Sequence, residues 1–208
     1  MCCRYLQNPR DDLAEIRRML EHKFVRIESG DFDAPDAFPD SPQERFPAQI
    51  CSVILLHKGV LRLLPALWGF KKWDGKGVVA NARSETVYTS RFFAESAEKY
   101  HCAVPARCFY EWSKPEGENT SAVKYGFRSD INEIYMAGIY RRGECGGEFA
   151  VLTKPAGEFA QIHPRTTCLI EPDRLPAWLG CETGADDLGT VKLYAFGQGA
   201  DVDKTSLQ

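Results

Sequence analysis

The chain has 208 residues, of which 44% are hydrophobic and 26% are charged, and its formal net charge at pH 7 is −3. This length and composition are typical of one globular domain with a substantial core. The negative net charge gives no general electrostatic reason to bind nucleic acid, so any site for a polyanion has to be a local basic patch. No apolar run approaches the ~20 residues that span a bilayer, and no secretory signal is recognisable, so we expect a cytoplasmic protein with no membrane partner.

At the start of the chain, Met1 precedes Cys2 and Cys3. Removal of Met1 would leave Cys2 as the first residue, with an amine and a thiol on adjacent carbons. An aldehyde can form an imine with that amine, and the thiol can then close on the same carbon to give a thiazolidine ring. The alternative is a frayed terminus that carries no chemistry.

The eight cysteines of the chain include no Cys-x-x-Cys pair, and no histidine lies at a ligand-like spacing from a cysteine pair. This pattern argues against a zinc site, and the missing export signal argues against a disulfide framework. We interpret most of the cysteines as small buried hydrophobic residues and expect neither a metal nor a cofactor.

The first third of the chain alternates between regular patterns and a long polar stretch. An amphipathic helix is expected over residues 10–24, with acidic residues in its first turn. Residues 28–47, rich in Asp, Pro, Ser and Gly, indicate a long loop. The apolar run 50–56 and its neighbour 60–64 predict a β-hairpin.

Two tryptophans and a polar stripe follow this hairpin. Trp68 and Trp73 flank two lysines, an arrangement that can stack unpaired bases and hold phosphates, although a core tryptophan at a strand end is the other explanation. Asn81, Arg83 and Glu85 alternate, so in an extended segment all three point to one face. That face is either a solvated edge or a site.

The second half of the chain is rich in predicted strands. After a predicted helix over 87–100, capped by Thr89 or Ser90, a strand over 102–112 ends with Glu111 between large aromatic residues. Burial there would raise the pKa of Glu111 towards neutrality and suit it to acid–base work, although a structural ion pair is the alternative. The further predictions are strands over 124–128, 134–140, 148–153 and 191–196, a turn over 141–147, a short helix over 173–179 and a mobile tail over 198–208.

Strands thus dominate, with a few irregularly placed helices, and we expect an α+β fold. The predicted architecture is one compact domain over residues 1–197, with curled, mainly antiparallel strands and peripheral helices. We expect a monomer.

Five segments occur in an order that resembles the SRAP family, the SOS-response-associated peptidases. They are Met1-Cys2-Cys3-Arg4-Tyr5, Trp68-Gly69, Asn81-Ala82-Arg83-Ser84-Glu85-Thr86, Pro105 with Phe109-Tyr110-Glu111-Trp112, and His163-Pro164-Arg165. The resemblance covers nearly the whole chain. It departs from the family pattern where Cys3 and Cys108 stand in place of usual glycines and where Thr166-Thr167 replaces a usual Met-Pro.

The resemblance implies a protein that shields abasic sites in single-stranded DNA through a covalent thiazolidine crosslink, and that has an associated autopeptidase and a lyase-like activity. It implies that Cys2 is the nucleophile, that Asn81 holds this cysteine, that Glu111 shuttles protons and that His163 assists the imine steps. It also implies DNA contacts by four residues: Arg4, Trp68, Arg83 and Arg165. Arginines near the Cys2 thiol would favour its thiolate form.

Two other functions are weighed beside this one. The first is a non-covalent reader of single-stranded or modified DNA, which would use the arginines and Trp68 without forming a bond. The second is a thiol peptidase that acts on other proteins, with Cys2 and His163 as a nucleophile–base pair.

Overall fold

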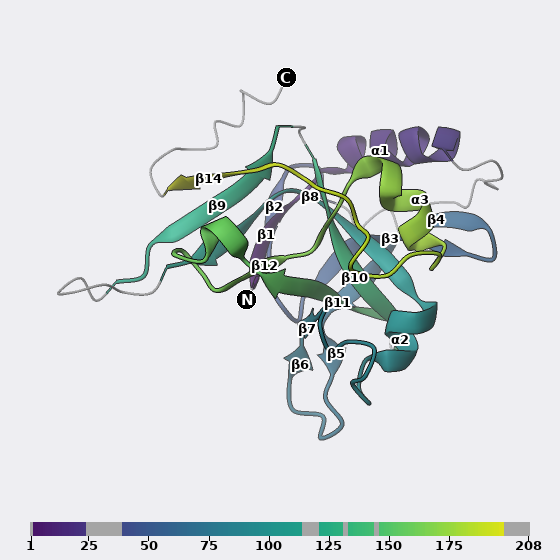
Figure 1. Cartoon of the computed structure of the whole chain (residues 1–208). Helices are drawn as coiled ribbons and strands as arrows, with labels where there is room; N and C mark the ends of the chain where they lie inside the picture. The colour runs from purple at the N-terminus through teal and green to yellow at the C-terminus, as the bar shows by residue number, and fades with distance from the viewer. Residues whose placement is uncertain (1, 24–38, 114–120, 131–132, 144–145, 198–208) are drawn as a thin grey trace.

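The computed structural model describes residues 2–23, 39–113, 121–130, 133–143 and 146–197 (Figure 1). The strands are β1 (Arg4–Gln7), β2 (Gln43–Arg45), β3 (Ile50–His57), β4 (Val60–Trp68), β5 (Phe70–Lys71), β6 (Val78–Val79), β7 (Asn81–Arg83), β8 (His101–Trp112), β9 (Lys124–Ser129), β10 (Ile134–Gly143), β11 (Gly146–Pro155), β12 (Arg165–Thr167), β13 (Leu169–Ile170) and β14 (Leu193–Gly197). The helices are α1 (Arg10–Lys23), α2 (Ala94–Lys99) and α3 (Leu175–Leu179), with short 3-10 turns η2 (Gly157–Phe159) and η3 (Pro172–Arg174).

Strands outweigh helices more strongly than a plain α+β description suggests, and this corrects the expected fold class. Twelve strands belong to one sheet, and β5 and β6 form a separate pair. The fold is compact, and its few helices lie at the periphery, as the sequence predicted (Figure 1). Among the described residues, no helix is long and apolar enough to cross a membrane.

The sheet closes on itself through a circuit of five strands. β8 pairs with β10, β10 with β11, β11 with β4, β4 with β3, and β3 with β8. The β11–β4 pairing is parallel and the other four are antiparallel. The longest strand, β8, extends beyond this circuit and pairs there with β1 and β9, so it connects the closed part of the sheet to the start of the chain.

Alternation of side chains along these strands produces two hydrophobic cores. On β8, Cys102 and Val104 belong to the core that contains Trp68 and Phe149, whereas Ala103 belongs to the core on the other face. The second core includes the buried residues of the helices: Leu13, Ile16, Ala97, Leu175, Trp178 and Leu179. The first core, which contains Trp68 and Phe149, is called the inner core because it fills the interior of the strand circuit. The second core lies between the sheet and its helices.

The predicted hairpin of β3 and β4 is confirmed, and its two-residue turn has a simple cause. Lys58 has φ 52° and Gly59 has φ 76°, so both central residues lie in the left-handed region. Two-residue turns of this kind match the right-handed twist of the paired strands. His57 consequently pairs with Val60, and the register continues to Ile50 opposite Leu67.

Several predicted elements have different bounds in the structure. The helix expected over 87–100 begins only at Ala94, and Thr89 does not cap it because its hydroxyl donates to the Thr86 carbonyl oxygen. The hydroxyl of Ser90 accepts a hydrogen bond from the Phe92 N–H, and α2 has no side-chain cap.

Two further corrections concern segments read as a turn and as a loop. The turn expected over 141–147 is largely strand, because β10 and β11 continue through Gly143 and from Gly146. The loop expected over 28–47 contains β2, while residues 24–38 of that region and the tail 198–208 lie outside the described residues.

Candidate functional site

The register between β1 and β8 brings the start of the chain to Glu111. Arg4 lies opposite Tyr110 and Tyr5 opposite Phe109, so the residues just before Arg4 run beside the end of β8. Cys2 is fully buried there within the inner core, and its thiol donates a hydrogen bond to the Arg4 carbonyl oxygen at 3.6 Å. The first described residue is therefore held in the fold.

Asn81 fixes the backbone of Cys2 from a different strand. Its Nδ2 donates to the Cys2 carbonyl oxygen at 2.8 Å. Asn81 is placed by β7, which runs parallel to β11 with Asn81 opposite Val151. The Oδ1 of Asn81 is buried and accepts no hydrogen bond from another described residue. A buried acceptor of this kind favours any donor that can reach it, because an unmade hydrogen bond costs about 1–3 kcal/mol.

Glu111 is 2% exposed, and burial raises the pKa of its carboxyl group to about 7. His163 lies beside it, with its Nδ1 3.7 Å from Glu111 Oε2. The same Nδ1 lies 2.8 Å from the Arg165 carbonyl oxygen, a contact that orients the ring through its own loop. A carboxyl group that titrates near neutrality beside an imidazole can both give and take a proton at physiological pH.

The electrostatics of the Cys2 thiol differ from the expectation based on nearby arginines. Burial, and secondly the charge of Glu111, raise the pKa of this thiol well above its usual value. The expected thiolate is therefore corrected to a neutral thiol, because burial removes the water that would stabilise the charged form. The exposed neighbour Cys3 also has its pKa raised, by partial burial and by Glu111.

Comparison with known proteins shows which family the chain belongs to. A family model described as SOS response associated peptidase (SRAP) matches residues 1–201. The chain belongs to the SRAP family.

Two curated relatives carry names that describe abasic-site processing. The abasic site processing protein YedK of Escherichia coli (strain K12) is 28% identical over 137 residues, which are 63% of this chain and 61% of that protein. The abasic site processing protein YoaM of Bacillus subtilis (strain 168) is 24% identical over 113 residues, which are 51% of this chain and 49% of that protein. The matched region thus spans 61% of the first relative and 49% of the second.

Solved structures share the fold at low sequence identity. A Bacteroides thetaiotaomicron protein superposes with a TM-score of 0.68 at 17% identity, and the match covers 94% of this chain and 91% of that chain. A phage-related protein from Bordetella bronchiseptica gives a TM-score of 0.70 at 20% identity, with coverage of 94% and 93%. The chain therefore shares its architecture with proteins from these two bacteria.

The three arginines expected to contact DNA differ in their ion pairs and in their exposure. Arg4 forms an ion pair with Glu44 at 3.1 Å, and its guanidinium lies over the Phe46 ring at 4.3 Å from the centroid. Arg83 is exposed at the end of β7 and forms no ion pair with another described residue. Of these two, Arg83 is thus the more readily available to an anion.

Arg165 is held by Glu85 in a bidentate ion pair, with two nitrogen–oxygen distances of 2.8 Å. These hydrogen bonds lower the pKa of Glu85 to about 2. A further hydrogen bond of 2.6 Å runs from Arg165 to the carbonyl oxygen of Thr153. Thr153 is fully buried and was not singled out from the sequence, since one threonine in a strand gives no signal of such a contact.

Trp68 does not lie where stacking with DNA would require it. The side chain is fully buried, its Nε1 donates to the Ala80 carbonyl oxygen at 3.1 Å, and its ring stacks with Phe149 at 6.3 Å. The expected contact of Trp68 with bases is therefore corrected to a structural role beneath the site. The exposed member of the pair is Trp73, at 79% exposure.

Within the ranges that the structure describes, no cluster of three or more His, Cys, Asp or Glu side chains could hold a metal ion.

Proposed function

We propose that this SRAP chain processes abasic sites in single-stranded DNA by forming a covalent bond through Cys2 after removal of Met1. The observation that carries the proposal is the convergence of Cys2, Asn81, Glu111 and His163 from four distant segments on one buried centre. The names of the E. coli and B. subtilis relatives support the choice of substrate.

The proposed reaction begins with the sugar of the abasic site. Its cyclic form opens to an aldehyde when a proton moves from the C1 hydroxyl group to the ring oxygen, and Glu111 can relay this proton because its pKa is about 7. The unprotonated amine of Cys2 then adds to the aldehyde to give a carbinolamine. Asn81 holds the carbonyl oxygen of Cys2 during this addition.

The carbinolamine loses water to form an imine, and the thiol of Cys2 adds to the same carbon. The sulfur–carbon bond closes the thiazolidine as the thiol proton passes to the nitrogen. His163 lies beside Glu111 and is suited to move protons during these steps. A neutral thiol suffices if its proton leaves as the bond forms, so the raised pKa of Cys2 is compatible with this chemistry.

The autopeptidase activity is proposed as part of the same site. Cleavage of the bond before Cys2 would require the thiol or a water molecule to attack the preceding carbonyl group, with Glu111 or His163 as the proton carrier. This activity would produce the amine that the crosslinking reaction needs.

Intact mass spectrometry combined with a denaturing gel tests the proposal. Protein that has lost Met1 should form an adduct with a single-stranded oligonucleotide that bears an abasic site, and the adduct should survive denaturant. Cys2→Ala should abolish it. Cys181→Ser, which alters a cysteine outside the site, is the matched control and should react like wild type. No adduct from the processed wild type, or an undiminished one from Cys2→Ala, would refute the proposal.

Non-covalent binding of single-stranded DNA is the second candidate, and the exposed side chains of Arg83 and Trp73 favour it. In that case, binding would fall steeply with salt and would be unchanged in Cys2→Ser and Glu111→Gln.

A further inference from the structure

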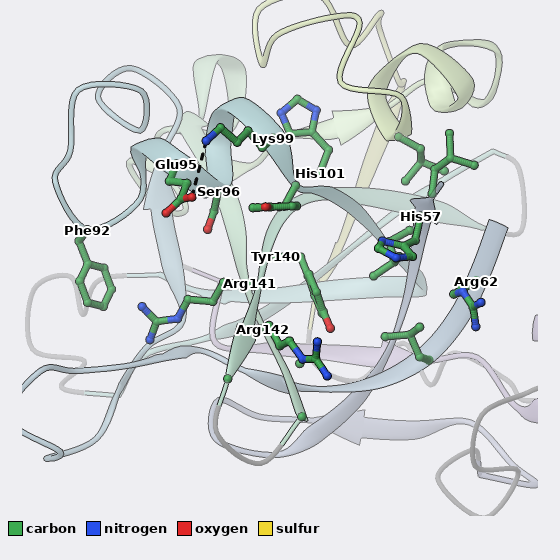
Figure 2. A pocket seen from close by; sticks show the side chains of 18 of the residues that line it. His57, Arg62, Phe92, Glu95, Ser96, Lys99, His101, Tyr140, Arg141 and Arg142 are labelled. Atoms are coloured by element: carbon green, nitrogen blue, oxygen red, sulfur yellow. Dashed lines mark ion pairs between the residues drawn. The ribbon is translucent and has the colours of Figure 1, made fainter. Parts of the chain in front are cut away.

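A concavity lies at the start of β8, away from the Cys2 centre at the end of the same strand, and Figure 2 shows it from close by. It has a volume of about 920 Å³ and is lined by parts of the β3–β4 hairpin, the β10–β11 hairpin and α2 with the turn before it. His101, at the first position of β8, lines it, whereas Glu111 lies ten residues further along the same strand. At the rise of an extended strand this separation is roughly 33 Å, so the two sites are distinct.

The lining of this pocket is strongly basic, although the protein as a whole is acidic. Among the described residues that line it, one carries a carboxylate, Glu95, and five carry a positive charge: Arg62, Arg91, Lys99, Arg141 and Arg142. These cations come from β4, β10, α2 and the turn before α2, and Figure 2 shows Lys99, Arg62 and Arg142 on different sides of the space. Like charges gathered in a concave surface focus a positive potential there and attract anions.

Two of the five cations, Arg91 and Arg142, are exposed and form no ion pair with another described residue. Glu95 pairs with Lys99 at 3.6 Å, but both side chains are more than half exposed, so the pair is weak. Arg141 forms a closer ion pair of 2.7 Å with Glu148 and also donates to the Lys71 carbonyl oxygen. Arg142 is exposed and belongs to neither pair.

Aromatic rings give the pocket flat surfaces beside its charges. Tyr140 lies over the backbone of Gly147, where a Cβ atom would collide with the ring, and it faces the space near Arg142 (Figure 2). Tyr100 is 47% exposed, and Trp73 is 79% exposed with the Phe92 ring against it at 5.3 Å. Exposed rings next to cations can stack a base while the cations hold its phosphates.

We propose that this pocket binds nucleotide phosphates, either of a free nucleoside polyphosphate or of a DNA strand. The volume lies within the range of small-molecule sites. Arginine dominates the lining, and its planar fork suits the oxygens of phosphate. The chemistry of Cys2 plays no part in this inference, so the two proposals can fail separately.

The test uses the full chain with Cys2→Ala, which removes the covalent reaction. Binding of pyrophosphate, ATP and a lesion-free oligothymidine is measured by calorimetry and fluorescence anisotropy. The double variant Lys99→Gln/Arg142→Gln changes two exposed side chains, so it should fold normally, as circular dichroism can verify. Its Kd should rise at least tenfold. Arg128→Gln, an exposed arginine on β9, is the matched control and should stay within twofold.

The three probes identify the source of the phosphates. Tight binding of ATP and pyrophosphate that the double variant loses supports a free nucleotide, whereas loss of oligothymidine binding alone supports a DNA strand. The proposal is overturned if none of the probes binds, or if the double variant binds them as the control does. It is also overturned if a polyglutamate peptide of equal charge competes as well as ATP, because the pocket would then select charge and not phosphate.

Discussion

Replacement of Glu111 by Gln removes the proton-transfer group of the proposed reaction and keeps its size. The carboxyl group of Glu111 is 2% exposed and its pKa is about 7. Near pH 7, about half of the molecules therefore carry the acid and half the carboxylate, so both directions of proton transfer are available. Positioned acid–base groups contribute factors of roughly 10²–10⁴ to rate, and Glu111→Gln should slow adduct formation by a factor in this range.

The pH dependence gives a second, independent magnitude. Above pH 7 the neutral carboxyl group becomes about tenfold rarer with each pH unit, whereas an unprotonated amine becomes more abundant up to the ordinary α-amino pKa of about 7.7–8.0. The product of the two populations is a bell with its maximum near pH 7.5, and its alkaline side belongs to Glu111. Glu111→Gln should therefore lose the alkaline decline and reach a plateau above pH 8.

The assay is single-turnover adduct formation by Met1-free protein with excess abasic oligonucleotide, quenched in denaturant and separated on a gel between pH 5.5 and 9.5. Glu98→Gln changes an exposed glutamate of α2 and is the matched control, which should retain the wild-type profile. A Glu111→Gln rate within threefold of wild type, or an alkaline decline at an unchanged pH, would refute the assigned role of Glu111.

Three further predictions follow from single contacts. Asn81→Ala removes the 2.8 Å hydrogen bond to Cys2 and should slow adduct formation about tenfold in the same assay, and an unchanged rate would show that Asn81 does not position Cys2. Trp68→Ala removes a large, fully buried side chain and leaves a cavity in the inner core, so it should lower the free energy of unfolding in urea by about 3–5 kcal/mol. A loss below 1 kcal/mol would contradict the burial of Trp68. Burial raises the pKa of Glu133 from 4.5 to about 8. The contribution of its neutral carboxyl group to the free energy of unfolding is therefore fully present below pH 4.5 and is lost as the pH rises through about 8. Glu133→Gln should therefore raise the free energy of unfolding by roughly 2–4 kcal/mol at pH 9 and change it little at pH 5, and equal urea midpoints at pH 9 would argue against this sign.

Long strands were predictable from the sequence because they carry enough residues to show a pattern. The apolar run at 50–56 and its neighbour at 60–64 gave β3 and the first part of β4, and Lys58-Gly59 supplied the turn between them. The predicted strand 102–112 became β8, which begins one residue earlier.

Short strands could not be predicted in the same way. β12 has three residues and β13 has two, so neither shows a periodicity. Their pairing with β11 and β10 depends on contacts between segments that are distant in the chain. The helix at 87–100 was predicted too long for a related reason, because turn-forming contacts such as Thr89 with Thr86 compete locally with helix and are not visible in apolar spacing.

The two tryptophans show what burial adds to composition. Trp68 and Trp73 flank the same two lysines, and both suit base stacking by residue type. Trp68 is the last residue of β4 and belongs to the inner core, whereas Trp73 follows β5 and is exposed. The choice between them depends on the end of one strand, which sequence reasoning fixes poorly.

Burial, which the sequence does not reveal, also decides the protonation state of the Cys2 thiol and so affects the proposed mechanism. The sequence places Arg4 two residues away, and charge alone would favour a thiolate. The fold instead buries Cys2 beside Glu111, and both effects raise the pKa of the thiol. Because this thiol is neutral, its proton has to leave as the carbon–sulfur bond forms. A group that accepts or relays a proton within the site is then required, and the position of Glu111 with His163 beside it is what makes the proposed reaction feasible from a neutral thiol.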